Sequence, residues 1–352
     1  MASYISHFEC SRTGETYPAR AVHGLSRAGG PLLARYDLAS LKGAVSREAL
    51  AKRTGGLWRY HEFLPVEMEK NRISLGEMMT PLIRAPRIEA LRGGADLYVK
   101  DESRLPAGSA MARGLALAVS MARELRLNHL AMAADGAAGV ALAAYAARAG
   151  LRATIFCADD AAPDIIGKLA ARRADVIRVN GRPEDCARIV REGTTDAGWF
   201  DVTPTQEPYF IEGMKTAGLE LAEQCGWKLP AWIFLGEGPA VDALAKAFDE
   251  LEAIGWIGPG RPSIVAVAVD GAIEAHAEMA REEGLLLSPD GAAAYAAYVR
   301  AVAERRVKRG ERAVLFNGAT LGGQPPPPIV TRIDRDAPIN YAQFRLKSSR
   351  DA

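Results

Sequence analysis

From residue 97 onward, the sequence alternates short apolar runs with longer segments of helical periodicity. Because a parallel strand can be reached only through a long crossover connection, this alternation predicts parallel sheets covered by helices on both faces. The expected fold class is therefore α/β. We expect strands at residues 97–100, 129–134, 152–157, 175–179, 231–235, 263–269 and 312–316. We expect helices at residues 111–126, 137–149, 162–173, 184–193, 211–226, 239–254 and 290–308.

The two ends of the chain follow other patterns. Residues 1–38 are polar with little periodicity, and residues 40–65 are consistent with two short helices. Residues 322–328 read GGQPPPP, and proline lacks the backbone N–H that regular structure needs. We therefore expect a linker there, followed by an extended tail.

The charge balance limits the classes of partner. The chain has 44 basic and 43 acidic residues, a formal net charge of +1, so nothing predicts binding to nucleic acid or to an anionic membrane. The amino terminus lacks a signal pattern, and the apolar stretch at 137–147 is too short to span a bilayer. The cysteines form no CxxC pair and the histidines show no metal-binding spacing. We expect a cytoplasmic protein without disulfides.

Three strand-to-helix turns are rich in small residues, and we expect them to meet at one edge of a sheet. They are Gly108–Met111, Ala134–Gly139 and Gly236–Ala240. Ligands of parallel sheets bind beyond the carboxyl ends of the strands, where backbone amides can hold phosphate or carboxylate. The third turn also matches half of a dinucleotide fingerprint, GxGxxG. Val241 stands at the final glycine and Glu237 places an anion where a pyrophosphate would lie, so dinucleotide binding is disfavoured.

A family resemblance extends over about residues 5–320 and is carried by collinear segments. They include SLGEMMTPL (74–82), LYVKDES (97–103), GSAMARG (108–114), EPYFIEGMKTAGLELAEQ (207–224), KAFDELEAIGWIG (246–258) and ERAVLFN (311–317). In these segments the chain resembles threonine synthase and its relatives, the tryptophan synthase beta-like or fold-type II pyridoxal-phosphate (PLP) enzymes. The resemblance implies a two-domain fold with a cleft between the domains.

The resemblance also implies a domain organisation. It consists of a degenerate zinc-ribbon-like segment at 1–40, a large domain at 41–106 plus 200–321, a small domain at 107–199, and a Pro-rich linker and tail at 322–352. In the family the first segment often carries two CxxC pairs. Here Cys10 is accompanied by Thr13, Ser26 and Ala28 at the matching positions. One thiolate cannot build a tetrahedral zinc site, so we expect no metal.

The main departure from the family is at Met111. The family's first turn resembles GSFKARG, and its lysine forms the Schiff base with the cofactor. A thioether cannot condense with an aldehyde or transfer a proton. Ser109 and Arg113 remain from this motif, and we interpret them as a helix cap and a surface or interdomain charge. Lys215, which matches a family lysine, is the candidate for a substitute amine.

Two further cofactor contacts of the family are altered. Its second turn resembles TxGNAG, but Ala134 and Ala137 stand here at the threonine-like and asparagine positions. Its phosphate loop resembles GGGTG, and here it reads Gly236–Ala240. Within that loop Pro239 removes an amide donor and Glu237 introduces a charge of the same sign as phosphate.

The fourth family motif resembles NTGSGLK, in which a hydroxyl residue faces the pyridine nitrogen. Here Asn317 is followed by Gly318 at the matching position. Because the framework segments are legible while the cofactor contacts are altered, we predict a binding or regulatory pseudoenzyme with no catalytic residue and no bound cofactor. The predicted residual ligand cleft comprises Ser109, Asp135, Gly136, Ala137, Gly139, Gly236, Glu237, Gly238, Asn317 and Gly318.

Two alternatives stay open at this point. One is a PLP-independent enzyme in the same cleft, with Ser109, Asp135, Lys215 and Glu237 as polar candidates. The other is a threonine-synthase-type lyase that holds PLP non-covalently or uses Lys215 as the amine. The expected partners are an unidentified small-molecule ligand and either a second copy, in a homodimer, or an active paralogue.

Overall fold

A computed structural model describes residues 3–134, 136–269 and 273–320. These residues belong to one compact unit. The division into a large and a small domain therefore stays a prediction. The linker and tail predicted at 322–352 lie outside the described residues.

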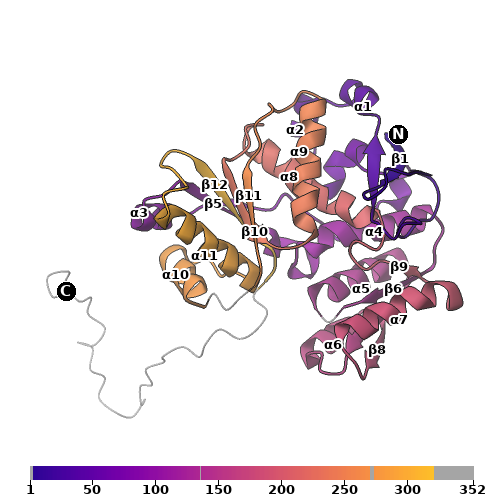
Figure 1. Cartoon of the computed structure of the whole chain (residues 1–352). Helices are drawn as coiled ribbons and strands as arrows, with labels where there is room; N and C mark the ends of the chain where they lie inside the picture. The colour runs from indigo at the N-terminus through magenta and orange to yellow at the C-terminus, as the bar shows by residue number, and fades with distance from the viewer. Residues whose placement is uncertain (1–2, 135, 270–272, 321–352) are drawn as a thin grey trace, which may run out of the picture. The chain divides into compact units, whose positions relative to one another are not determined.

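The first sheet contains five strands and is parallel except at one edge. Its order is β11 (Ser263–Val267), β10 (Trp232–Gly236), β12 (Arg312–Asn317), β5 (Asp96–Asp101) and β4 (Leu82–Arg84), with β4 antiparallel to β5. Two helices pack on one face, α8 (Tyr209–Gln224) and α9 (Pro239–Ala253). The other face is covered by α3 (Pro86–Arg92), α10 (Ile273–Glu283) and α11 (Pro289–Ala303) (Figure 1).

The second sheet contains four parallel strands. Its order is β8 (Asp175–Val179), β7 (Arg152–Ala158), β6 (His129–Ala133) and β9 (Phe200–Asp201). On one face pack α4 (Met111–Glu124), α5 (Ala137–Ala149) and α6 (Pro163–Ala170). On the other face packs α7 (Pro183–Asp196) (Figure 1).

The amino-terminal segment forms a small antiparallel sheet that the sequence pattern did not indicate. Its order is β2 (Thr16–Pro18), β1 (Ile5–Cys10) and β3 (Leu32–Tyr36). The thiol of buried Cys10 hydrogen-bonds to the Ser26 hydroxyl at 3.0 Å. Two of the positions that resemble zinc ligands are thus joined by a hydrogen bond.

Short helices connect this sheet to the rest of the chain. They are α1 (Leu38–Ala44), α2 (Arg47–Ala51) and the 3-10 turns η1 (Leu57–Phe63), η2 (Glu69–Asn71), η3 (Glu102–Arg104) and η4 (Pro106–Gly108). Each strand and helix predicted from residue 97 onward is present, which confirms the α/β fold class. Periodicity missed short elements such as β4, β9 and α3, because few residues give little periodic signal. It also missed the 11-residue helix α10.

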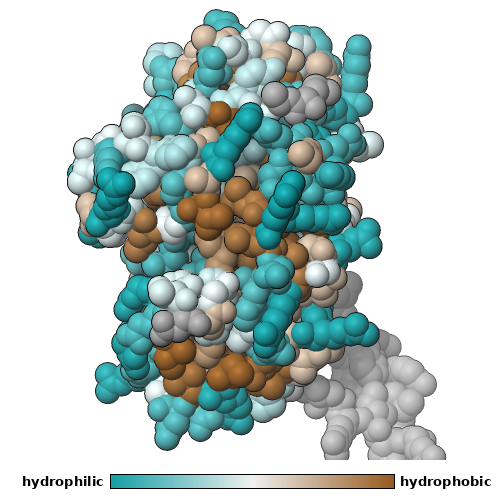
Figure 2. Space-filling view, turned by 90° about the vertical axis from the view of Figure 1, so that its right-hand side faces the viewer, coloured by the Kyte–Doolittle hydropathy of each residue, from teal (hydrophilic) through white to brown (hydrophobic). Residues whose placement is uncertain are grey.

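Figure 2 shows a largely hydrophilic face on which apolar side chains gather near the middle and again toward the lower end. The exposed large hydrophobic residues in the described ranges are Val22, Met68, Leu75, Met78, Leu91, Ile177, Val269 and Leu286. None of the helices in these ranges has the length and apolar character needed to cross a membrane.

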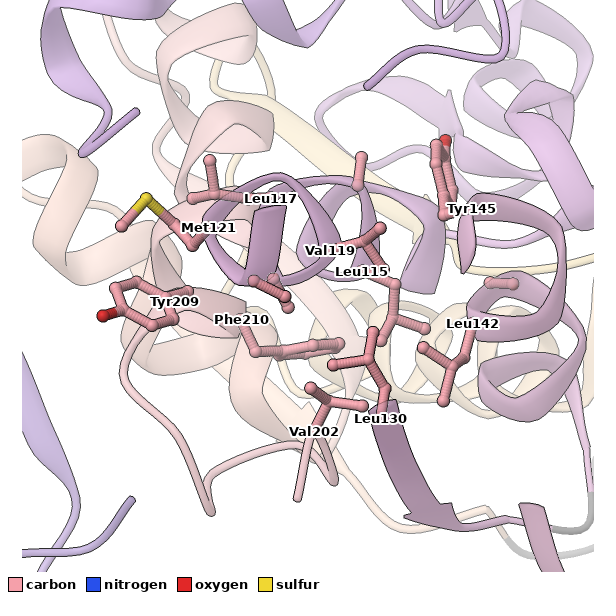
Figure 3. Packing of buried hydrophobic residues seen from close by; sticks show 14 of the residues in the cluster. Leu115, Leu117, Val119, Met121, Leu130, Leu142, Tyr145, Val202, Tyr209 and Phe210 are labelled. Carbon is pink, nitrogen blue, oxygen red and sulfur yellow. The ribbon is translucent and has the colours of Figure 1, made fainter. Parts of the chain in front are cut away.

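Helix α4 lies in the centre of the largest apolar cluster. Its side chains, including Leu115 and Val119, pack against β6, α5 and the start of α8 (Figure 3). Gly114 and Gly213 allow α4 and α8 to approach closely. A methyl group at residue 213 would overlap the carbonyl oxygen of Arg113, and one at residue 114 would overlap the Phe210 ring. This contact fixes the position of the amino terminus of α4.

We expect Gly213→Ala to lower the free energy of unfolding by on the order of 2 kcal/mol or more, because the overlap is with backbone and can be relieved only by separating the helices. Gly167→Ala in α6 is the matched control. No atom lies near the added methyl there, so it should raise stability by about 0.5–1 kcal/mol. Urea unfolding followed by circular dichroism measures both, and equal stability of the two variants would contradict this packing.

The side chain of Glu207 lies at the amino terminus of α8 and binds its first backbone amides. It is buried and accepts from the amides of Tyr209 at 2.5 Å and Phe210 at 2.8 Å. Burial raises the pKa of Glu207 to about 8, aided by the charge of Asp201 and opposed by the two amides. The folded state therefore holds this proton more tightly than the unfolded state, in which the pKa is near 4.5.

The free energy of unfolding should consequently fall as the pH rises from about 5 to about 8, since the folded state must release a proton that the unfolded chain has already lost. Glu207→Gln removes this titration, although it loses one of the two acceptors. We expect a smaller pH slope in the variant than in the wild type, measured by urea unfolding at several pH values. Parallel slopes would show that Glu207 is ionised in the folded protein.

Candidate functional site

A cavity of about 510 Å³ lies at the carboxyl ends of β5, β6, β10 and β12. Helices α4, α5, α9 and α11 begin at its wall. Of the positions predicted from sequence, the cavity brings together Ser109, Met111, Gly136, Ala137, Gly236, Glu237, Gly238 and Gly318. Asp135 lies outside the described residues. The three small-residue turns therefore do converge on one space.

Asn317 and Gly139 were also predicted here but do not line the cavity. The side-chain carbonyl oxygen of Asn317 accepts from the backbone amide and the hydroxyl of Ser288, at 2.7 and 2.8 Å. Its side-chain amide donates to the Asp101 carboxylate at 3.0 Å. Asn317 thus joins β12 to β5 and to the start of α11. Gly139 is buried in α5, where an added Cβ would lie 3.2 Å from that of Ala134. Both residues pack against elements that line the cavity without lining it themselves.

Met111 is the first residue of α4, and its side chain is partly buried against the core. Its amide donates to the Ser109 hydroxyl at 3.2 Å. The residue before the helix is Ala110, and α4 has no side-chain cap, so the prediction that Ser109 caps the helix is wrong. The neighbouring amide of Ala110 donates to the Gly318 carbonyl at 2.7 Å. The turn is therefore held by backbone bonds to the loop after β12, and a thioether stands at its cavity face.

Lys215 does not line this cavity. Its side chain is fully buried, and the ammonium group lies 2.6 Å from Glu212, 2.9 Å from Glu250 and 2.8 Å from the carbonyl of Phe63. The ring of Tyr36 lies 4.2 Å away. The geometry gives no support to Lys215 as a substitute amine, because its ammonium group is enclosed by these partners.

Beneath the cavity lies a buried charge network formed by Lys100, Glu102, Arg113 and Glu220. Arg113 is only 1% exposed, so its interpretation as a surface charge is wrong. Its partners Glu102 and Glu220 belong to the predicted large domain, which is compatible with the alternative of an interdomain charge. The guanidinium of Arg113 donates to both oxygens of Glu102, at 2.6 and 2.9 Å, and to Glu220 at 3.1 Å. Lys100 donates to Glu220. The two positive and two negative charges balance.

The pKa values within this network follow from burial and pairing. Burial opposes ionisation of Glu102, but Arg113, Lys100 and the Thr80 hydroxyl together outweigh it and lower the pKa of Glu102 below its ordinary value. Burial lowers the pKa of Lys100, while Glu220 and Glu102 act in the opposite direction. Glu102 also lines the cavity, yet its charge is neutralised by the guanidinium of Arg113, 2.6 Å away. It therefore contributes little field to the cavity.

Two other acids line the cavity, Glu237 and Asp290. The part of the lining that the structure describes contains no lysine, arginine or histidine. Asp290 approaches Gly318 and Gly236 so closely that a Cβ on either residue would meet its side chain, at 2.9 Å from the Asp290 Cβ for Gly236. Sequence reasoning missed Asp290, because an acid in the first turn of a helix is indistinguishable from a residue that stabilises the helix end.

The phosphate loop of the family is poorly suited to phosphate here. Pro239 has no N–H, and the amide of Glu237 donates to the carbonyl of Val267 at 2.9 Å within the sheet. The carboxylate of Glu237 adds a repulsive charge. With no amine at residue 111, the residues of this cavity do not fit covalently bound PLP. In the described ranges as a whole, no cluster of three or more His, Cys, Asp or Glu side chains could hold a metal ion.

We expect Arg113→Met to lower the free energy of unfolding by about 3–5 kcal/mol, because two buried carboxylates would then share one cation. Arg152→Met is the matched control, since its ion pair with Asp175 at 2.7 Å is exposed and should matter little. Urea unfolding midpoints of the two variants test this difference. Similar midpoints would mean that the network does not support the fold.

Comparisons with known proteins agree with this architecture. The family model for pyridoxal-phosphate dependent enzymes matches residues 73–272. Threonine synthase of Methanocaldococcus jannaschii is 33% identical over 281 residues, which cover 78% of this chain and 68% of the relative. The Methanosarcina acetivorans threonine synthase is 31% identical over 271 residues, 75% of this chain and 65% of the relative. The chain therefore spans about two thirds of the length of these relatives.

Solved structures show a similar fold at low identity. Threonine deaminase isoform 2 from Solanum lycopersicum has a TM-score of 0.61 at 18% identity, covering 77% of this chain and 87% of that structure. Escherichia coli diaminopropionate ammonia lyase in its apo form has a TM-score of 0.60 at 16% identity, covering 90% and 94%. At such identities the likeness concerns the fold.

Proposed function

The chain belongs to the pyridoxal-phosphate-dependent enzyme family and is threonine-synthase-like, and on that premise we propose that it has lost PLP-dependent catalysis. In this proposal it acts as a binding or regulatory pseudoenzyme that uses the family's cleft for a different ligand. Family membership provides the scaffold, whereas the function depends on the groups in the cleft.

The observation that carries the proposal is the thioether of Met111 at the start of α4. PLP catalysis requires a primary amine to hold the cofactor aldehyde and to move a proton. Met111 lines the cavity, and the described lining offers no lysine in its place. Lys215 is enclosed by two carboxylates and a carbonyl. The described lining of this cleft therefore offers no amine for covalent attachment of PLP.

The loss of cofactor contacts is compatible with a stable fold. The contacts that hold α4 and the loop after β12 are made by the backbone and by residues beneath the cavity, such as Arg113 and Asn317. None of them requires a bound cofactor. A ligand-binding role can therefore persist after the chemistry is lost.

The two enzymatic alternatives find less support in the site. Ser109 and Glu237 line the cleft, but Ser109 has neither a histidine nor a lysine in the described lining to activate it as a nucleophile. Homodimer formation or pairing with an active paralogue is a further part of the proposal, consistent with exposed apolar residues such as Met68 and Met78.

The proposal is tested by adding PLP to the purified full chain, reducing with borohydride and mapping any labelled lysine by peptide mass spectrometry. We expect no saturable label on a residue of the cleft, because the required amine is absent. The double variant Met111→Lys, Glu237→Gly should gain a label at residue 111, since it restores the amine and removes the charge that opposes phosphate. Stoichiometric labelling of the wild type at Lys215 would overturn the proposal.

A further inference from the structure

We propose that this cleft binds a small organic cation, with a protonated amine at Asp290 and Glu237 and an apolar body against the apolar residues of the lining. The inference rests on the proposed function and deepens it, because it names the class of ligand. It differs from the phosphate and carboxylate groups that the family resemblance implies for this space.

The size and walls of the cleft fit a small apolar body. Its volume of about 510 Å³ lies within the range typical of small-molecule sites. Met111, Ala134, Ala137, Leu244 and Phe316 contribute apolar surface. A ligand with an aromatic or branched aliphatic group would remove this surface from water.

The charged side chains in the described part of the lining are all acidic. Glu102 is neutralised by Arg113, whereas the side chains of Asp290 and Glu237 have no hydrogen bond or ion pair with any other described residue. Asp290 is half-buried and Glu237 is exposed, so the unpaired carboxylate of Asp290 attracts a cation, and repels phosphate or carboxylate, more strongly than that of Glu237. The selectivity therefore follows from the sign of the charge.

The position of Asp290 is built into the surrounding backbone. Its carboxylate occupies the space that a side chain at residue 318 would fill, and Gly236 leaves room on the other side. Helix α11 is already capped by Ser288, which accepts from the Gly291 amide at 3.4 Å. The Asp290 side chain is therefore not needed as the helix cap and stands at the cavity wall.

A buried hydroxyl adds a second, independent contact. Ser109 is only 2% exposed and lines the cleft. Its oxygen accepts from the Met111 amide, but its hydroxyl proton has no acceptor among the described residues. Buried donors of this kind are normally satisfied, so Ser109 can donate to a hydroxyl or carbonyl oxygen of the ligand.

The test uses benzylamine and benzoate, which share a ring and differ in charge, together with inorganic phosphate. Binding to the full chain is measured by ligand-observed NMR titration. We expect benzylamine to bind with a dissociation constant on the order of millimolar, and benzoate and phosphate to bind at least about tenfold more weakly. Added salt should weaken the benzylamine binding.

Variants assign the effect to the cleft. Asp290→Asn should weaken benzylamine binding about threefold or more, and Glu237→Gln should weaken it in the same direction. Asp160→Asn, an exposed acid away from the cleft, makes the same charge change and should leave binding unchanged. Retained folding of each variant is checked by circular dichroism.

The inference is overturned if benzoate or phosphate binds as well as benzylamine, if Asp290→Asn and Asp160→Asn behave alike, or if benzylamine does not bind at about 20 mM. These results leave the proposed loss of PLP chemistry standing, because that proposal is judged by the lysine label. Conversely, a label on Lys215 would overturn the proposed function whatever the amine titration gave.

Discussion

The structure around the cleft depends on one buried set of charges, Lys100, Glu102, Arg113 and Glu220. These residues come from β5, the turn that follows it, α4 and α8, so the network joins the five-stranded sheet to the helix that covers the four-stranded sheet. Buried charges are tolerated only while each keeps its partner, because an unpaired charge in the interior is strongly destabilising. Together with the close approach of α4 and α8 at Gly114 and Gly213, the network fixes where α4 begins, and with it the position of residue 111.

This arrangement explains how a scaffold can outlast its chemistry. Arg113 and residue 111 are two positions apart on α4, yet Arg113 points into the network whereas Met111 faces the cavity. Replacing a cavity-facing amine with a thioether disturbs no buried charge. Replacing Arg113 would leave two carboxylates with one cation. Stability therefore constrains one residue of the motif and leaves the other free to change.

A second buried cluster of charges joins the amino-terminal sheet to two helices of the five-stranded sheet. Lys215 and Lys246 lie between Glu212 and Glu250, and Tyr36 of β3 donates to Glu212 at 2.7 Å. The cluster connects the amino-terminal sheet to α8 and α9. Lys215 is thus a structural cation, enclosed by Glu212, Glu250 and the carbonyl of Phe63.

The sequence by itself determined the α/β class, most of the strands and helices from residue 97 onward, the three small-residue turns and the thioether of Met111. These features are local, since periodicity and turn composition depend on neighbours along the chain. Only the tertiary structure decided that Arg113 and Lys215 are buried, that Asp290 reaches the cleft, and that Asn317 supports its wall. Each of these depends on partners distant in sequence, such as Glu220 for Arg113, and the fold alone brings those partners together.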